Sequence, residues 1–206
     1  MRLVDRVRSA VYDAAIVGMT ADWYRAVLER LPNGCRLLDV GVGTGAALIA
    51  NADVLREKDV RVTGVDVDAA YVDRCRRTIV EKRLDRWIAV RLESIDVHAG
   101  GPYDAVYFSA SFMLLPNPVG TLRHIRTVTT ADALVYFTQT FEHRRSRAVE
   151  LAKPLLRRVT TIDFGRVTYE EDFRETLAKA RYELITTETL DGGSRRSGML
   201  AIARAS

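Results

Sequence analysis

The sequence has little of several features that would separate it from ordinary globular proteins. None of its 206 residues belongs to an apolar run approaching the roughly 18 residues that a transmembrane helix needs. Asp5, Arg6 and Arg8 interrupt the first apolar residues, so we expect no secretory signal. Only 2 cysteines occur, and Cys35 and Cys75 form no CxxC pair. They predict two buried thiols in a cytoplasmic protein.

Linkers, repeats and metal-ligand clusters are also missing. We therefore expect one domain over residues 1–206, with residues 1–31 as an N-terminal helical cap, and no metal site. The formal net charge of +4 comes from dispersed residues and gives no firm signal for a nucleic-acid partner. No feature predicts an oligomeric state.

Between residues 36 and 138, short apolar runs alternate with helical patterns. This alternation predicts an α/β fold with a doubly wound, mostly parallel sheet and helices on both faces. The expected strands are Arg36–Val40, Val60–Val65, Trp87–Leu92, Tyr103–Phe108 and Ala133–Thr138. The expected helices between them are 46–56, 69–82 and 119–128.

The C-terminal third follows a looser pattern. A helical stretch is expected near Arg147–Arg157. Thr168, with Glu171 three residues later, predicts a capping box that begins a helix through Ala180. Two final strands, 182–189 and 199–203, flank a turn-like segment and predict an antiparallel hairpin at the edge of the sheet.

Three glycines follow the first expected strand. Gly41, Gly43 and Gly45 stand between that strand and a helix, where glycine lets the backbone turn tightly and approach a ligand. Asp66 follows the next strand, 21 residues after Gly45, where a carboxylate can accept hydrogen bonds from ribose hydroxyls. The combination predicts a site for an adenosine-containing cofactor.

Two cofactors fit this pattern. Gly41–Ala46 also satisfies the dinucleotide pattern GxGxxA. Asp39 favours S-adenosylmethionine instead, because dinucleotide-binding proteins usually have an apolar residue there, and an acid can help hold the ammonium group of the methionine end. A single domain also leaves an NAD enzyme no room for a separate catalytic region.

The segment Leu37–Gly45, Leu-Leu-Asp-Val-Gly-Val-Gly-Thr-Gly, resembles motif I of the class I methyltransferases, which use S-adenosylmethionine. Val62–Asp66 resembles their second motif, and Tyr103–Pro118 and Leu122–Thr140 resemble the regions around their fourth and fifth strands. The resemblance implies a seven-stranded sheet whose last strand is antiparallel, which agrees with the expected hairpin.

The resemblance also assigns roles around the cofactor. Asp39 would help fix the methionine end, Asp66 would bind the ribose, and Val67 would pack on the adenine. Glu93 with Ser94 would lie beside the adenine amine, with Asp96 as a rival. The complete set of expected cofactor-binding residues is Asp39, Gly41, Gly43, Thr44, Gly45, Asp66, Val67, Glu93, Ser94 and Ser109.

Residues for the acceptor are harder to choose. His143 follows the fifth strand, at the edge where ligands of parallel sheets bind, and is the candidate catalytic base. Tyr12 and Trp23 are expected in an N-terminal lid, with packing as the alternative. Ser111 and Phe112 follow the fourth strand and are further candidates for substrate contact.

Three classes of function remain open at this point. The leading prediction is a methyltransferase that acts on a small-molecule or lipid-precursor acceptor and releases S-adenosylhomocysteine. The second is an RNA or protein methyltransferase, although the Asn/Asp-Pro-Pro-Tyr/Phe signature of enzymes that methylate planar amines is missing. The third is a non-catalytic cofactor-binding protein or an NAD-dependent oxidoreductase.

Overall fold

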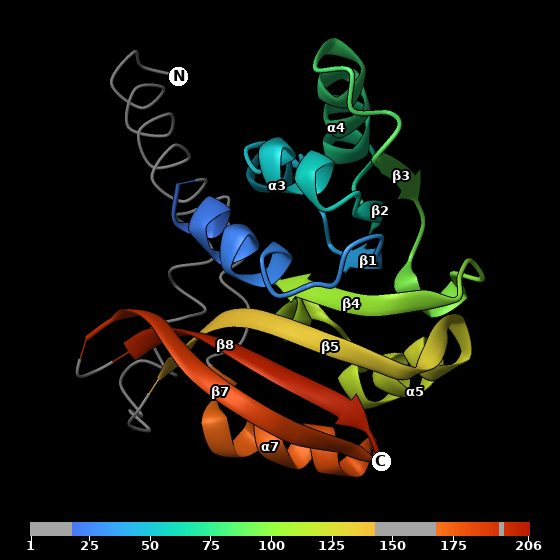
Figure 1. Cartoon of the computed structure of the whole chain (residues 1–206). Coiled ribbons are helices and arrows are strands. Elements are labelled where there is room, and N and C mark those ends of the chain that lie inside the picture. The colour runs from blue at the N-terminus through green and yellow to red at the C-terminus, as the bar shows by residue number, and fades with distance from the viewer. Residues whose placement is uncertain (1–17, 143–167, 194–195) are drawn as a thin grey trace, which may run out of the picture.

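The computed structural model describes residues 18–142, 168–193 and 196–206, which form a sheet with helices on both faces (Figure 1). The sheet order is β3-β2-β1-β4-β5-β8-β7, and a two-residue strand, β6, pairs with the end of β5. Strands β1 to β5 are parallel, and β8 runs antiparallel to both β5 and β7. The strands are β1 (Arg36–Val40), β2 (Arg61–Asp66), β3 (Ile88–Leu92), β4 (Tyr103–Ser109), β5 (Thr129–Glu142), β6 (Thr168–Tyr169), β7 (Tyr182–Gly192) and β8 (Arg196–Ala205). The predicted doubly wound sheet with a C-terminal antiparallel hairpin is confirmed.

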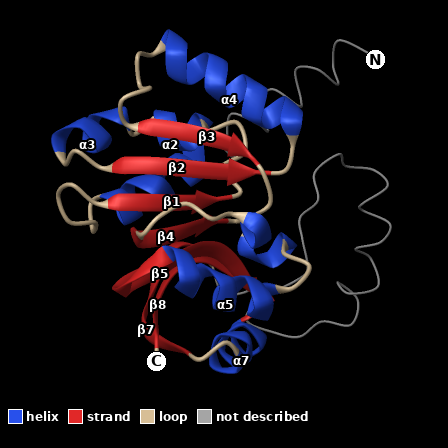
Figure 2. Ribbon diagram, turned by 90° about the vertical axis from the view of Figure 1, so that its right-hand side faces the viewer, coloured by secondary structure: helices blue, strands red, loops and turns tan. Residues whose placement is uncertain are grey.

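Helices cover both faces of this sheet (Figure 2). The described part of the first helix spans residues 18–28. The others are α2 (Ala46–Ile49), α3 (Ala52–Glu57), α4 (Ala69–Glu81), α5 (Pro118–Val128) and α7 (Glu170–Lys179), with 3-10 turns η1 (Ile95–Val97) and η2 (Phe112–Leu114). None of the described helices has the length and apolar content needed to cross a membrane.

Alternation along the strands sends neighbouring side chains into two separate cores. Leu37 and Tyr107 face the first helix and α4, whose buried side chains include Cys75. Leu38 and Phe108 face the opposite side, where α5 and α7 pack. Because both faces are covered, the central strands are apolar nearly throughout, as the sequence predicted.

Two local predictions were wrong. Thr168 is not at the N-cap position: Thr168 and Tyr169 form β6, and α7 begins at Glu170 with Tyr169 as its N-cap. Thr168 and Tyr169 pair with Phe141 and Glu142 of β5, and this strand pairing outweighs the local capping pattern. The helix expected over residues 46–56 is divided into α2 and α3 at Asn51, whose amide donates to the carbonyl oxygens of Ala47 and Ala21.

Some expectations lie outside the described residues. The helix near Arg147–Arg157, Tyr12 and His143 belong to this group. The single domain with residues 1–31 as a helical cap stays a prediction, of which the described helix over residues 18–28 is one part.

Candidate functional site

The glycine turn lies at the carboxyl end of β1, in the centre of the parallel part of the sheet. The amides of Gly41 and Val42 both donate to the carbonyl oxygen of Val65, at 2.8 and 3.3 Å, which ties the turn to the end of β2. Gly41, Gly43 and Gly45 have φ angles of 78°, 58° and 67°, the left-handed region that favours glycine. The backbone conformation alone therefore favours glycine at all three positions.

The three glycines differ in what surrounds them. A Cβ atom on Gly41 would lie 2.5 Å from the Cβ of Ser111, and one on Gly45 would lie 2.4 Å from the Sγ of Cys75. A Cβ on Gly43 would meet nothing within 4 Å. The outer glycines therefore allow close internal packing, whereas the middle one borders open space into which a ligand can approach.

Asp66 lies beside this turn at the end of β2. Its Oδ2 accepts from the Gly43 amide at 2.8 Å, and its Oδ1 accepts from the Asp68 amide at 2.9 Å. Asp68 in turn caps α4 by accepting from the amides of Ala70 and Tyr71. Because a carboxylate has about four acceptor sites, Asp66 keeps capacity for two further hydrogen bonds while its orientation is fixed.

Asp39 has a different environment. Its side chain is fully buried, its Oδ2 accepts a 2.8 Å hydrogen bond from the Tyr24 hydroxyl, and its Oδ1 is buried without a partner. Burial raises the pKa of Asp39 to about 7, although the hydrogen bond from Tyr24 acts in the opposite direction. Such a carboxyl group gains from a nearby cation, which would stabilise its ionised form.

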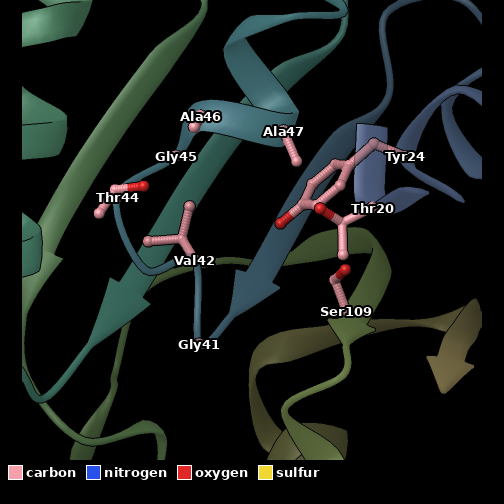
Figure 3. A pocket seen from close by; sticks show the side chains of 9 residues that line it. All are labelled: Thr20, Tyr24, Gly41, Val42, Thr44, Gly45, Ala46, Ala47 and Ser109. Carbon is pink, nitrogen blue, oxygen red and sulfur yellow. The ribbon is translucent and has the colours of Figure 1, made fainter. Parts of the chain in front are cut away.

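A cleft separates the first helix from the glycine turn (Figure 3). Tyr24, Thr20 and Ser109 lie on one side, and the turn with the start of α2 lies on the other. The cleft therefore joins the ends of β1 and β4 to the N-terminal helix. The sequence predicts that the methionine end of the cofactor and the transferred methyl group lie here.

The predicted adenine end lies one strand further along the sheet. Glu93 donates its backbone amide to the Asp66 carbonyl oxygen at 3.0 Å, and Val67 is 73% exposed beside it. The Ser94 hydroxyl accepts from the Asp96 amide and caps η1. Asp96, the rival of Glu93, accepts a 2.7 Å hydrogen bond from Thr121 on α5. Of these two acids, Glu93 is the one whose backbone contacts Asp66, the predicted ribose-binding residue.

The candidate acceptor residues are spread over different surroundings. The Ser111 hydroxyl is buried and donates to the carbonyl oxygen of Val40. Phe112 is 6% exposed and packs edge-to-face on Phe108 and Phe137. Trp23 is 2% exposed, and its indole N–H donates to Asp191 at 2.7 Å. Trp23 lines a second cavity, with Met19 and Leu190, rather than the cleft beside the glycine turn.

The structure also brings forward residues that the sequence pattern did not single out. Tyr24 and Thr20 reach the cleft from the first helix, where helical spacing alone does not separate them from core residues. Gln139 on β5 is 1% exposed, with both amide atoms unpartnered. His98 is fully buried between Glu93 and Tyr103. Only the sheet register and the loop geometry reveal these contacts.

Comparisons with known proteins agree with this geometry. A family model described as a methyltransferase domain matches residues 38–135. The structure of geranyl diphosphate C-methyltransferase from Streptomyces coelicolor A3(2) matches with a TM-score of 0.71 at 14% identity, over 92% of this chain and 79% of that one. A SAM dependent methyltransferase from Aquifex aeolicus matches with a TM-score of 0.65 at 19% identity, over 87% and 88%. No curated protein sequence shows significant similarity to the chain.

A third solved structure differs in its chemistry. The (4+2)-cyclase SpnF matches with a TM-score of 0.71 at 18% identity, over 90% of this chain and 81% of that one. At these identities the structures show a shared fold, and the match to the family model adds the methyltransferase domain. Residues 38–135 therefore form a methyltransferase domain, and the chain shares its fold with S-adenosylmethionine-dependent methyltransferases, in agreement with the resemblance of its motifs to the class I enzymes. The predictions of the fold and of the enzyme class are confirmed.

Proposed function

We propose that the protein binds S-adenosylmethionine across the carboxyl ends of β1, β2 and β3 and transfers its methyl group to a small-molecule acceptor. The observation that carries this proposal is the open space at Gly43 directly beside the Asp66 carboxylate. This carboxylate accepts a 2.8 Å hydrogen bond from the Gly43 amide. Few folds other than nucleotide-binding ones place a left-handed glycine turn and a fixed acid together at the end of a parallel sheet.

The proposed cofactor fits the polarity of the site from end to end. Asp66 has acceptor capacity for two ribose hydroxyls, and the exposed Val67 offers an apolar surface to the adenine. At the other end, the buried carboxyl group of Asp39 suits the ammonium group of the methionine portion, directly or through water. Thr44 belongs to the turn that lines the cleft between these ends.

The chemistry asks little of the protein beyond positioning. The bound cofactor supplies an activated methyl group on its sulfonium. The side chains of Ser109, Thr20 and Tyr24 border the cleft where that group would lie, so they would orient the acceptor and exclude water. Of the described histidines, His98 is fully buried and His124 donates from its Nε2 to the His98 carbonyl oxygen, and neither lines this cleft. His143 remains the proposed base for acceptors that must lose a proton.

The lining of the site supports a small-molecule acceptor. The first helix bounds one side of the cleft through Thr20 and Tyr24. Among the structural neighbours are methyltransferases of geranyl diphosphate and a mitomycin 7-O-methyltransferase, so lipid-like and aromatic acceptors should be tried first.

The two cysteines are free and buried, which supports a cytoplasmic location as part of the same proposal.

Calorimetric titration with S-adenosylmethionine, S-adenosylhomocysteine and NAD tests the cofactor. We expect micromolar binding of the first two and none of NAD. Asp66→Ala and Gly43→Trp should each abolish binding without unfolding the protein, because one removes the ribose acceptor and the other fills the open space at the turn. Asp59→Ala, which removes an exposed carboxylate on the loop before β2, is the control and should bind normally. Binding of NAD alone would refute the assignment.

Methyl transfer is measured separately with a labelled methyl group and a panel of small acceptors. Because a cyclase shares this fold, cofactor binding alone does not establish transfer. Release of S-adenosylhomocysteine that depends on the acceptor is the expected result. Tight cofactor binding with no transfer to small molecules, and transfer to RNA or protein instead, would favour the second class of function.

A further inference from the structure

A buried histidine stands behind the acid at the adenine end of the site. His98 is 0% exposed, and its Nδ1 lies 2.6 Å from the Oε1 of Glu93. Its other ring nitrogen, Nε2, lies 2.9 Å from the hydroxyl of Tyr103, which begins β4 and is itself buried. The three side chains form one continuous hydrogen-bonded row from the core to the edge of the cofactor site.

A neutral imidazole beside an ionised carboxylate gives one arrangement of the protons along this row. An ionised carboxylate only accepts hydrogen bonds, so the Nδ1 of His98 must donate to Glu93. In the neutral ring, Nε2 is then the acceptor, and the Tyr103 hydroxyl donates to it. Tyr103 thus selects the ring form that presents an N–H to Glu93.

The surroundings hold the ring in place. The carbonyl oxygen of His98 lies 2.8 Å from the Nε2 of His124 on α5. A Cβ atom on Gly100 would lie 2.7 Å from the His98 Nε2 and 2.8 Å from the Tyr103 hydroxyl oxygen. Only glycine at position 100 therefore leaves room for the row. Such close packing allows the imidazole little choice of rotamer.

Glu93 is the member of the row that meets solvent. Its side chain is 26% exposed, whereas that of His98 is fully covered. Its backbone amide donates to the carbonyl oxygen of Asp66, so it lies directly beside the proposed ribose acid. With Oε1 held by His98, Oε2 is the oxygen that is left to accept a hydrogen bond from a ligand.

We propose that His98, held by Tyr103, is a positioning residue that orients Glu93 so that its free oxygen selects a cofactor with a 6-amino purine. This inference rests on the proposed function, because it assumes that the adenine lies beside Glu93. A carboxylate only accepts hydrogen bonds, so it binds the adenine amine favourably. It repels the 6-oxo group of hypoxanthine, which presents an oxygen at the same place.

The experiment compares binding of S-adenosylhomocysteine with that of S-inosylhomocysteine, its 6-oxo counterpart, by calorimetry. A hydrogen bond to a charged group contributes about 1.5–3 kcal/mol, so the wild-type protein should prefer the adenine form by roughly ten- to a hundred-fold. Glu93→Gln tests the orientation directly. Because the His98 N–H would bind the carbonyl oxygen of the new amide, its NH2 group would face the ligand, and the preference should reverse towards the 6-oxo form.

Variants of His98 provide an independent comparison. In His98→Asn the amide nitrogen stands as many bonds from Cβ as Nδ1 does, so the donor to Glu93 is retained and the preference should persist. In His98→Gln the amide reaches the position of Nε2 instead, so the preference should fall towards unity. His124→Gln changes a histidine that contacts the same loop without touching Glu93, and it should leave the ratio unchanged.

The outcomes separate this inference from the proposed function. If the wild-type protein binds neither compound, the cofactor assignment fails. If it binds both equally, or if Glu93→Gln keeps the wild-type preference, the orienting role of His98 is overturned while the cofactor assignment stands. Equal changes of the ratio in His98→Gln and His124→Gln would also overturn it, because they would show a general effect of the loop. Thermal melting confirms that each variant is folded, and Glu93→Gln keeps the test decisive if the His98 variants are not.

Discussion

At the residue scale, Asp39 combines the strongest burial with an incomplete set of hydrogen bonds. Its carboxyl group accepts a hydrogen bond from Tyr24. It also interacts electrostatically with the ionisable groups of Asp66, Tyr107 and Cys75. Because its pKa is raised to about 7, the folded protein holds a proton that the unfolded chain releases near its usual pKa of about 4. The contribution of Asp39 to stability therefore falls as pH rises, which is the opposite of the usual behaviour of an acidic side chain.

The first prediction concerns this pH dependence. Between about pH 4 and pH 7 the unfolded state binds fewer protons than the folded state, so the contribution of Asp39 to stability falls as pH rises and levels off above 7. The full effect is at most about 4 kcal/mol at 1.36 kcal/mol per pKa unit. Asp39→Asn should remove this slope and unfold at higher denaturant concentration at pH 8.

Chemical denaturation of both proteins at several pH values checks the prediction. The difference between the two curves isolates Asp39 from the other titrating groups. A difference that is constant from pH 4.5 to 8 would contradict it. The same proton should leave when the cofactor binds near pH 6, because a nearby ammonium group favours the carboxylate. Calorimetry in buffers of different ionisation enthalpy would detect that release, and Asp39→Asn should not show it.

Gln139 carries the second prediction at this scale. Both atoms of its amide are buried without partners on the face of β5 that it shares with Phe137 and Phe141. An unsatisfied buried polar group costs about 1–3 kcal/mol. Gln139→Met keeps the length of the side chain and should raise the free energy of unfolding by about that amount.

The neighbouring residue offers a control for this substitution. Thr138 is equally buried, but its hydroxyl is hydrogen-bonded to that of Tyr107 at 2.6 Å. Thr138→Val should therefore destabilise the protein, whereas Gln139→Met stabilises it. Urea denaturation measures both. A loss of stability in Gln139→Met would mean that the amide is satisfied in solution, for instance by an internal water.

At the scale of elements, the glycine turn serves two purposes at once. The third prediction separates them with a single methyl group. Gly43→Ala places a Cβ in open space, so its cost should be limited to the backbone strain of roughly 1–2 kcal/mol for a left-handed residue. Gly45→Ala adds a contact 2.4 Å from the Cys75 sulfur on α4 and should lose about 1–3 kcal/mol more through overpacking.

Binding should follow the opposite order. Gly43→Ala directs its methyl group towards the proposed ligand and should weaken S-adenosylhomocysteine more than Gly45→Ala does in the folded protein. Cys75→Ala supplies the check, because shortening that side chain should recover part of the stability lost in Gly45→Ala. A double-mutant cycle measures the recovery. Additive effects of the two substitutions would show that the contact with α4 does not limit this position.

The elements also show which structure can be predicted from a sequence. Each parallel strand was recognisable because it is a short apolar run between helical patterns, and the glycine turn was recognisable because its spacing has few other uses. Strand pairing over long distances leaves no such local sign. Thr168 and Glu171 therefore predicted a helix cap, although Thr168 pairs with Phe141. The same limitation hid Tyr24, since its contact with Asp39 depends on how the first helix packs on the sheet.

For the whole molecule, the first helix connects parts that are distant in the sequence (Figure 1). Tyr24 reaches the cofactor side through Asp39, and Asn51 binds the carbonyl oxygen of Ala21. On the other side, Trp23 binds Asp191 at 2.7 Å, and Arg30, which follows the helix, forms a 2.6 Å ion pair with Glu188; both acids lie on β7. The helix is thereby attached to β1, to the start of α3 and to the antiparallel hairpin.

The fourth prediction follows from this arrangement. A ligand in the cleft touches the turn and the first helix together, so it should suppress local opening of both. Hydrogen exchange with S-adenosylhomocysteine should show added protection over residues 18–28, 41–47 and around Ser109, and little change at the far end of β7. Trp23→Phe removes the indole donor without removing the ring, so residues 18–28 should exchange faster with and without ligand.

Two outcomes decide whether the helix belongs to the site. Protection confined to residues 41–47 would make the helix a structural cover that the ligand does not reach. If the ligand protects residues 18–28 in the wild-type protein and protects them less in Trp23→Phe, the hairpin holds the helix in its binding position. In that case Trp23, although it is buried and does not line the cleft, contributes to cofactor affinity through Asp191. A helix that opens more often is in its binding-competent position for a smaller fraction of the time, which weakens the apparent affinity.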